Sequence, residues 1–286
     1  MICTLCHKPA AVLIPKGTVS PQVAVYRCRP CGVDFLGQTG AADYWDTLGQ
    51  EEIYEDAQVA AERADSFNSI LKKLEAFRPV GSLLDVGAGK GEFAILAARR
   101  GWKVSVVEPS SRATEGLAQR GIREVLNSPF EDFRPQHGYD CVTFLDVLEH
   151  TRDPLKVLRQ AADCLQPGGV FVALTPDARS LVRRLALVAA RLSSRFRGLL
   201  RYQYYVPHLF YLSEKALTRL VRQAGLQACA VEHTATPKRF LLAKLKRHYA
   251  GMPGNGFFRA AISAAYPLAR LGLTNKLVVY AWKPRQ

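Results

Sequence analysis

Residues 83–91 read Leu-Leu-Asp-Val-Gly-Ala-Gly-Lys-Gly, and they decide the fold of this chain. The apolar residues run into a turn that holds Gly87, Gly89 and Gly91, and the alanine-rich segment 93–98 follows. This order predicts a buried strand, a tight loop and a helix. Because glycine has no Cβ, such a loop turns sharply and lets a ligand approach the N-terminus of the helix. The stretch therefore predicts an α/β fold with a ligand site after its first strand.

A second predicted strand narrows the kind of ligand. Residues 103–107 are mostly apolar and end in Glu108, 23 residues after Asp85. An acidic residue at this place accepts hydrogen bonds from the two hydroxyls of a ribose. The two strands together predict a site for a cofactor that contains adenosine.

Two further stretches show which cofactor this is. Residues 139–154 read Tyr-Asp-Cys-Val-Thr-Phe-Leu-Asp-Val-Leu-Glu-His-Thr-Arg-Asp-Pro, and residues 164–174 read Cys-Leu-Gln-Pro-Gly-Gly-Val-Phe-Val-Ala-Leu. With the glycine turn, the chain resembles the class I S-adenosylmethionine-dependent methyltransferases over residues 80–235. It is most similar to the branch with the ubiquinone-biosynthesis O-methyltransferases and many sugar methyltransferases. The resemblance implies methylation of a small-molecule, sugar or lipid-linked acceptor, with O-methylation favoured.

The resemblance also implies a role for each residue near the glycine turn. Asp85 is expected to orient the turn and to contact the amino-acid end of S-adenosylmethionine, and Glu108 to hold the ribose hydroxyls. The backbone that passes under the methionine and ribose is that of Gly87, Ala88, Gly89 and Gly91.

Three residues after later strands complete the expected cofactor site. Phe130 ends the loop 127–130 and is expected to stack on the adenine. Leu145 and Asp146 end the fourth strand and are expected to border the methionine moiety. Packing explains Phe130 equally well, and helix capping explains Asp146.

Two histidines are candidates for the base that removes a proton from the acceptor. An unperturbed imidazole titrates close to neutral pH, which suits this role. His208 lies where the chain returns to the core on the expected substrate side, and His150 lies after the fourth strand. We favour His208. The alternatives are a hydrogen bond at a helix end for His150 and a place just before the helix cap Ser213 for His208.

The N-terminal cysteines predict a metal site. Cys3 and Cys6 form one C-x2-C pair, and Cys28 and Cys31 form a second pair that is separated from the first by 21 residues. Two such turns supply the four thiolates that Zn²⁺ prefers, with no position left open for chemistry. We therefore expect a structural zinc ribbon. A short hairpin of residues 10–14 and 23–26 is expected between the pairs.

Composition indicates the class and compartment of the protein. The chain has 286 residues, of which 48% are hydrophobic, enough for a full α/β core and a small accessory module. It shows no run of 18 apolar residues and no signal-peptide pattern. Seven cysteines without a signal favour a reducing compartment, so we expect a cytoplasmic protein. We expect burial as small hydrophobes for the remaining cysteines Cys141, Cys164 and Cys229.

The predicted organisation is a zinc-ribbon-like module over residues 1–45, a linker and helix over 46–80, and a methyltransferase domain over 81–286. The domain is expected to be a seven-stranded Rossmann-like sheet with helices on both faces. The expected strands are residues 82–86, 103–107, 123–126, 139–145, 168–174, 226–232 and 276–282, the last one antiparallel. Two insertions, 178–207 and 238–275, exceed what this fold needs.

The two insertions carry the positive charge. Each holds seven Lys or Arg residues and no acidic residue, and the whole chain has a net charge of +14. In the first insertion, apolar residues recur at helical spacing along one stripe, with arginines over the rest of the surface. The stripe residues are Leu181, Leu185, Val188, Leu192, Phe196 and Leu199.

This pattern leaves two interpretations open. The stripe packs on the domain with the arginines in water, or the segment meets an anionic membrane surface or an acidic, lipid-linked acceptor. The second interpretation would place the protein at the inner face of the membrane.

Two other functions compete with that of a small-molecule methyltransferase. A methyltransferase for ribosomal or transfer RNA bases would use the basic insertions on phosphates. However, Thr175-Pro-Asp177 replaces the motif typical of amino-directed base methylation. A non-catalytic scaffold with a degenerate cofactor fold conflicts with the intact glycine turn and Glu108.

Overall fold

The computed structural model of the chain describes residues 1–37, 57–122, 124–248, 256, 259–260, 263–264, 266–267 and 274–285. The contacts divide the chain into two compact units. The first unit comprises Met1–Ser66, Pro176–Ser213 and His233–Lys276, and the second comprises Phe67–Thr175, Glu214–Glu232 and Leu277–Gln286. Residues 38–45 of the predicted ribbon-like module and 46–56 of the predicted linker and helix lie outside the described residues.

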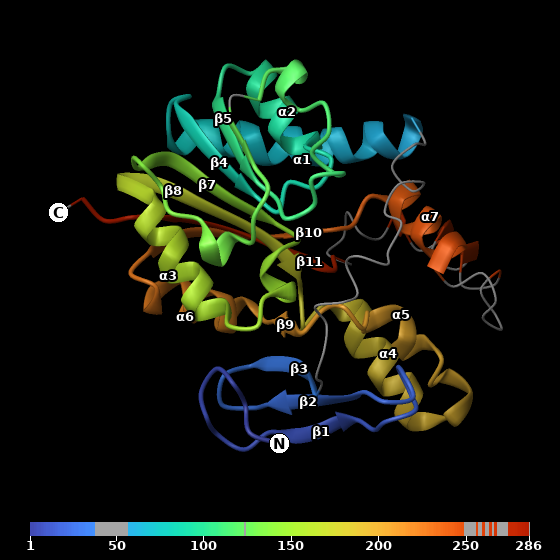
Figure 1. The fold of residues 1–286 in the computed structure, drawn as a ribbon. Coiled ribbons are helices and arrows are strands. Elements are labelled where there is room, and N and C mark those ends of the chain that lie inside the picture. Colours follow the sequence, from blue (N-terminus) through green and yellow to red (C-terminus); the bar gives the residue numbers. More distant parts are fainter. Residues whose placement is uncertain are drawn as a thin grey trace. The chain divides into compact units, whose positions relative to one another are not determined.

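The second unit is built on a seven-stranded sheet with the order β10-β11-β8-β7-β4-β5-β6 (Figure 1). The strands are β4 (Ser82–Val86), β5 (Lys103–Val107), β6 (Glu124–Leu126), β7 (Tyr139–Leu145), β8 (Leu165–Pro176), β10 (Gln227–Thr234) and β11 (Lys276–Trp282). The pairs from β8 through β7, β4 and β5 to β6 are parallel. The predicted seven-stranded fold is confirmed, and β8 is longer at both ends than the sequence predicted.

Hydrogen bonds confirm that β11 is antiparallel. The start of β8 bonds to the end of β11, where the Gly168 amide donates to the Lys283 carbonyl at 2.8 Å. Just past the end of β8, the Asp177 amide donates at 2.9 Å to the carbonyl of Asn275, immediately before β11. Strands that meet start to end in this way run in opposite directions.

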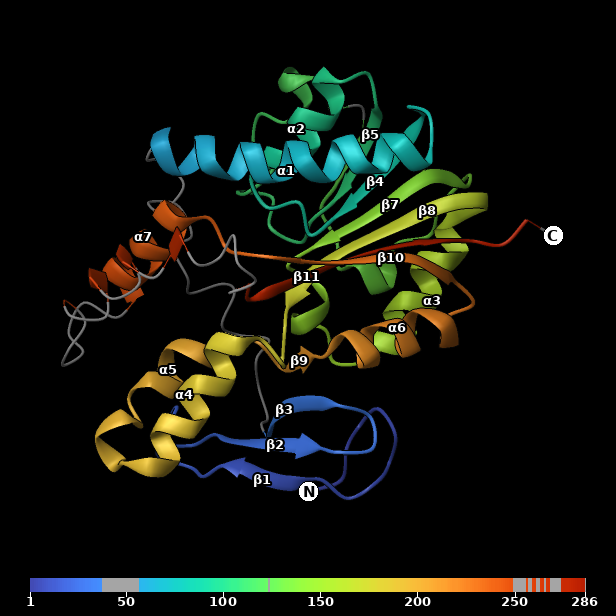
Figure 2. The ribbon, with the colours of Figure 1, turned by 180° about the vertical axis from the view of Figure 1, so that it is seen from behind.

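Helices cover both faces of this sheet, as the alternating sequence pattern predicts. The helices are α1 (Ala57–Phe77) and α2 (Glu92–Arg99) on one face, and α3 (Pro154–Cys164) and α6 (Glu214–Gln223) on the other (Figures 1 and 2). On the first face Phe67, Ile70, Leu71 and Leu74 of α1 share a core with α2, β4 and β11. Short 3-10 turns are η3 (Ala118–Arg120), η4 (Phe130–Asp132) and η5 (Leu148–His150).

The N-terminal part of the first unit is a small antiparallel sheet with the order β1-β2-β3-β9. Its strands are β1 (Ala11–Ile14), β2 (Ala24–Cys28), β3 (Val33–Gly37) and β9 (Phe210–Leu212). The pairing of β1 with β2 confirms the predicted hairpin. Strand β9, which follows the first insertion, pairs with β3, so the segment after the insertion joins the sheet of the ribbon.

The first insertion differs from the single helix expected through Leu199. Helix α4 (Leu181–Leu192) ends at Ser193, whose side chain accepts a hydrogen bond from the Arg195 amide and begins a new turn. Then follow η6 (Ser194–Phe196) and α5 (Leu199–Gln203). The serine pair interrupts the helix because its side chains compete for backbone hydrogen bonds.

The side of α4 that is buried also differs from the expectation. The side that packs against the ribbon carries Ala186, Leu187 and Ala190, which share a core with Val25 and Leu36. Five residues of the expected apolar stripe are exposed, namely Leu181, Leu185, Val188, Leu192 and Phe196, whereas Leu199 packs beside this core. The stripe is therefore not the side that buries α4 within the first unit.

One arginine of α4 is not in water as expected. Arg183 is 4% exposed, and its guanidinium lies over the rings of Tyr204 and Tyr211, 4.8 and 4.1 Å from their centroids. Aromatic faces stabilise a desolvated guanidinium at these distances.

The described part of the second insertion begins with helix α7 (Lys238–His248). Among the described helices, none is long and apolar enough to cross a membrane.

Candidate functional site

The expected cofactor residues lie at or after the ends of four neighbouring strands, β4, β5, β6 and β7. β4 pairs with β5 on one side and with β7 on the other, all parallel, so their carboxyl ends share one edge of the sheet. The chain goes from β4 outward to β5 and β6, and then returns to β7, so the strand order reverses beside β4. Ligands bind at such a reversal in open α/β sheets.

The glycine turn after β4 has the backbone that the sequence indicates. Gly87, Gly89 and Gly91 have φ angles of +66°, +52° and +70°. A Cβ on Gly87 would lie 2.6 Å from Val147, and a Cβ on Gly91 would lie 2.5 Å from Leu117, so these two positions lack room for a side chain. A Cβ on Gly89 would meet no atom within 4 Å. Open space beside a left-handed backbone is what a bound ligand needs at this position.

Glu108 follows β5 and is held against this turn. One carboxylate oxygen accepts a hydrogen bond from the Gly89 amide at 2.9 Å, and the other accepts one from the Ser110 amide at 3.1 Å. Asn127 donates from its side-chain amide to the Glu108 carbonyl at 3.1 Å. The carboxylate is therefore oriented by the backbone, and its remaining lone pairs are available to hydroxyl donors.

Asp85 is buried at the end of β4, with 2% of its surface exposed. Thr143 in β7 donates a hydrogen bond of 2.6 Å from its hydroxyl to the Asp85 carboxylate. Burial raises the pKa of Asp85 to about 7, because the desolvation cost of the charged form exceeds the effect of the Thr143 bond. Sequence reasoning missed Thr143; its signal is a polar residue inside an apolar strand.

Phe130 and Asp146 lie where packing and backbone geometry explain them. Phe130 is buried, with its ring stacked on Phe133 at 6.1 Å and edge-on to Phe144 at 5.2 Å. Asp146 has a φ of +62°, and its amide donates to the Leu174 carbonyl at 2.8 Å. Leu145 packs beside the core of the first face. Their contact with a cofactor stays a prediction.

His150 belongs to the second unit and ends η5, where its amide donates to the Val147 carbonyl at 3.0 Å. Its neighbour Glu149 is fully buried and accepts a hydrogen bond of 3.0 Å from the Thr175 hydroxyl. Sequence reasoning gave Glu149 no role, because the polar residues around it give no sign that it is buried.

His208 belongs to the first unit and lies among aromatic side chains. Its ring centroid is 5.1 Å from that of Tyr205 and 5.5 Å from that of Tyr211. The amide of His208 donates to the Tyr205 carbonyl at 2.9 Å. A half-buried imidazole beside phenol rings is a suitable position for proton transfer.

The structure brings the four N-terminal cysteines together. The Sγ atoms of Cys3 and Cys31 are 3.5 Å apart, those of Cys6 and Cys28 are 3.4 Å apart, and those of Cys6 and Cys31 are 3.6 Å apart. A tetrahedral Zn²⁺ with Zn–S bonds of about 2.3 Å would hold its sulfurs about 3.8 Å apart. The cluster therefore fits this ion with only a small outward shift.

Backbone geometry and charge around the cysteines agree with a metal site. His7 and Gly32 follow the two pairs and have φ angles of +55° and +75°, which turns each pair into a knuckle. Burial raises the pKa of Cys3 and Cys31, so these thiols need a cation to become thiolates. The other cysteines, Cys141, Cys164 and Cys229, are separate, and the first two are fully buried as expected.

Comparisons with known proteins agree with this geometry. The family model described as "Methyltransferase domain" matches residues 57–231. A ubiquinone biosynthesis O-methyltransferase of Xanthomonas campestris pv. campestris is 30% identical over 127 residues, which are 41% of this chain and 52% of that protein. One of Saccharophagus degradans is 24% identical over 213 residues, covering 71% of this chain and 85% of that protein. The chain thus spans about half the length of the first of these relatives.

Solved structures share the fold. The 1,6-didemethyltoxoflavin-N1-methyltransferase of Burkholderia thailandensis, with S-adenosylhomocysteine bound, has a TM-score of 0.54 and 15% identity. The match covers 93% of this chain and 97% of that one. Because the family model covers more than half of the chain, the resemblance seen in the glycine turn is confirmed, and the chain belongs to the methyltransferase-domain family of S-adenosylmethionine-dependent enzymes.

Proposed function

We propose that this protein transfers a methyl group from S-adenosylmethionine to an oxygen atom of a small-molecule acceptor. The observation that supports this best is the hydrogen bond between Glu108 and the glycine turn at Gly89, in a chain of the methyltransferase-domain family. This bond places a carboxylate beside a left-handed turn with open space above it. Ribose hydroxyls need such a carboxylate.

The chain's own residues would bind and orient the cofactor. Glu108 accepts hydrogen bonds from the ribose hydroxyls, Asp85 holds the end of β4, and Leu145, Asp146 and Phe130 border the cofactor. The turn that passes beneath the methionine and ribose is formed by Gly87, Ala88, Gly89 and Gly91. When bound, S-adenosylmethionine supplies a methyl group on a sulfonium, which an acceptor atom displaces in line.

A base is needed when the acceptor is a hydroxyl. His208 is proposed for this role and His150 is the second candidate. Removing a catalytic base lowers kcat by about 10²- to 10⁴-fold. His208→Gln should therefore lower kcat strongly while the affinity for S-adenosylhomocysteine stays within twofold of the wild type. A strong loss in His150→Gln alone would reverse the assignment.

The acceptor is proposed to be a small molecule, a sugar or a lipid-linked compound that carries negative charge. The names of the relatives favour oxygen as the methylated atom in those proteins. The arginines of the first insertion supply the positive charge that an anionic acceptor needs.

Cys3, Cys6, Cys28 and Cys31 are proposed to hold one structural Zn²⁺. The spacing of their sulfurs suits tetrahedral coordination, and four thiolates leave no position for a substrate. We further propose a cytoplasmic location with peripheral contact at the inner face of the membrane, which needs a surface suited to lipid.

Methyl transfer is tested by incubating the protein with methyl-labelled S-adenosylmethionine and fractionated cell extracts. Label should enter a small or lipid-extractable molecule, and alkaline stability of the labelled product separates ethers from esters. In calorimetry with S-adenosylhomocysteine, Glu108→Ala should lose two hydrogen bonds to a charged group, each worth about 1.5–3 kcal/mol. Glu124→Ala, an exposed acid on β6, is the matched control. Equal affinity in both variants would refute the ribose site.

A further inference from the structure

A row of apolar side chains on the first unit is exposed. In helix α4, Leu181, Leu185, Val188 and Leu192 are 45%, 57%, 50% and 81% exposed, and Phe196 in η6 is 48% exposed. We call these five residues the α4 ridge. Steps of four, three and four residues place the first four on one stripe of the helix. Contiguous exposed apolar residues mark a surface that contacts a partner or a membrane.

The ridge is not left over from an incomplete core. The opposite stripe of α4, with Ala186, Leu187 and Ala190, already fills the core that the insertion shares with the ribbon. The first unit therefore buries this helix without using the ridge. Polar residues at the ridge positions would cost this packing nothing, so the apolar ones need another reason.

Positive charge surrounds the ridge. Arg184 and Arg191 are exposed on the stripe of α4 next to the ridge, three residues after Leu181 and Val188, and Arg195 is exposed in η6. The segment 178–213 contains seven arginines and no acidic residue. Such a surface attracts anions over about 8–10 Å at physiological salt.

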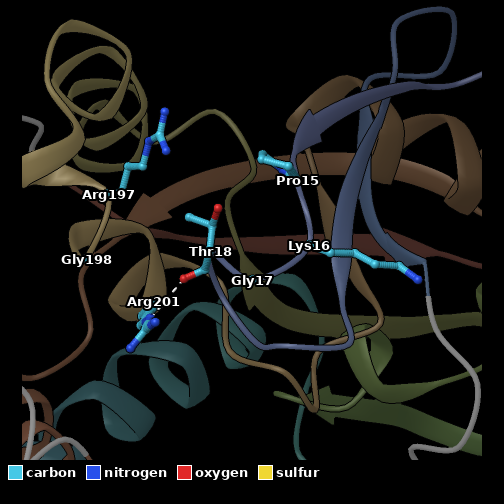
Figure 3. A pocket seen from close by; sticks show the side chains of 7 residues that line it. All are labelled: Pro15, Lys16, Gly17, Thr18, Arg197, Gly198 and Arg201. Atoms are coloured by element: carbon cyan, nitrogen blue, oxygen red, sulfur yellow. Dashed lines mark hydrogen bonds between the residues drawn. The ribbon is translucent and has the colours of Figure 1, made fainter.

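A basic cleft continues the ridge beyond Phe196. It has a volume of about 320 Å³ and is lined by Pro15, Lys16, Gly17, Thr18, Arg197, Gly198 and Arg201 (Figure 3). Lys16 comes from the loop after β1, and Arg197 and Arg201 come from the segment around α5. The Arg201 guanidinium donates to the Thr18 carbonyl at 2.9 Å, which fixes its position at the cleft. Three cationic residues line the cleft, and their positive charge attracts anionic groups such as phosphate.

We propose that the α4 ridge and this cleft form a docking surface for an anionic phospholipid bilayer. The ridge side chains enter the boundary between headgroups and acyl chains, and Arg184, Arg191 and the cleft residues pair with lipid phosphates. Charge complementarity decides the occupant, because an apolar row within an acid-free basic segment matches a surface that offers phosphates above hydrocarbon. The inference gives the proposed peripheral membrane contact its surface and does not depend on methyl transfer, so its failure would leave the proposed methyl transfer standing.

The experiment is co-sedimentation of the full chain with vesicles of phosphatidylcholine alone or mixed with phosphatidylglycerol. We expect binding to the mixed vesicles only. Leu185→Ser/Leu192→Ser should bind about tenfold more weakly at any salt concentration, since it loses buried apolar area. In Arg184→Glu/Arg191→Glu/Arg195→Glu, the affinity for the mixed vesicles should fall about fivefold per substituted residue at low salt. The fall should be smaller at high salt, because salt screens the charges.

Matched controls separate docking from general charge or folding effects. Val80→Ser removes an apolar side chain of the second unit that is 44% exposed, and Lys103→Glu/Arg120→Glu/Arg159→Glu makes the same charge change there. Both should bind as the wild type does, and all variants should keep its thermal unfolding midpoint.

Four results would overturn the proposal. The first is no binding of the wild type to mixed vesicles at low salt. The second is unchanged binding of the ridge variant. The third is a wild-type dimer in sedimentation velocity that the ridge variant makes monomeric, because a second copy would then cover the ridge. Free phosphate or glycerophosphate that competes fully with vesicles would likewise assign the cleft to a soluble anion.

Discussion

The Tyr204 hydroxyl donates a hydrogen bond of 3.0 Å to the Asp34 carboxylate, across 170 residues of sequence. Asp34 is fully buried in β3 and also accepts two hydrogen bonds of 2.7 Å from Arg27. Burial raises the pKa of Tyr204, so its hydroxyl stays protonated as a donor at neutral pH. This buried group ties the ribbon to the first insertion within one unit.

Tyr204→Phe should therefore destabilise the first unit. The ring stays packed against Tyr211, at 5.0 Å between centroids, while the bond to a charged acceptor is lost, at a cost of about 1.5–3 kcal/mol. The measurement is the urea midpoint of the metal-loaded chain. Tyr26→Phe is the control, because that ring stacks on Phe35 and its hydroxyl makes no hydrogen bond within the described residues. Equal midpoints for the two variants would contradict the role of the Asp34 bond.

Cys28→Ser should lose the bound metal and loosen both the ribbon and α4–α5. Metal analysis of wild-type protein purified without chelator should find about one zinc per chain. Hydrogen exchange should then rise in β1–β3 and in α4 of the variant, because these elements share a core. Cys229→Ser, which changes a thiol of the second unit, should keep the metal. Iron alone, or no metal in the wild type, would refute the zinc site.

The glycine turn allows a paired test. Gly89→Ala places a Cβ in open space, so it should lower the stability of the fold only by the left-handed backbone strain of about 1–2 kcal/mol. The affinity for S-adenosylhomocysteine should fall at least tenfold, because the Cβ occupies the space of the ligand. Gly91→Ala should cost more stability, because its Cβ would lie 2.5 Å from Leu117. Calorimetry and thermal unfolding measure the two effects. A Gly89→Ala variant with wild-type affinity would show that the ligand does not pass over this turn.

Asp85 predicts a pH dependence of stability. Its folded pKa of about 7 lies above the model-compound value of 3.8, so the folded chain keeps a proton that the unfolded chain releases. The stability that Asp85 contributes is therefore present below pH about 4 and is lost as pH rises to about 7. The shift corresponds to roughly 4 kcal/mol as an order of magnitude.

The comparison with Asp85→Asn isolates this effect. The unfolding free energy of the wild type should fall relative to that of Asp85→Asn as the pH rises from 5 to 8. Thr143→Val should strengthen the dependence, because Thr143 stabilises the charged form of Asp85. A difference that does not vary with pH would show that Asp85 titrates normally.

Much of the second unit is determined by local sequence. The bounds of β4, β5, β7 and β11 agree with the apolar runs that predict them. Parallel strands buried on both faces must be continuously apolar, and the glycines that follow β4 must have positive φ, so both features are visible in the residues themselves. The cysteine pairs are equally local, because two thiols on one turn form half a metal site whatever else folds around them.

The arrangement of the first unit was decided only by the tertiary structure. The sequence stripe of Leu181, Leu185, Val188 and Leu192 is the more hydrophobic side of α4, yet the core uses the side with Ala186 and Ala190. Small alanines let the helix approach the ribbon sheet closely. On the same side, the Arg183 guanidinium packs over two tyrosine rings. Hydrophobic periodicity reports which residues are apolar but not which partner will cover them. That choice depends on the pairing of β9 with β3, a contact between distant segments that no local pattern records.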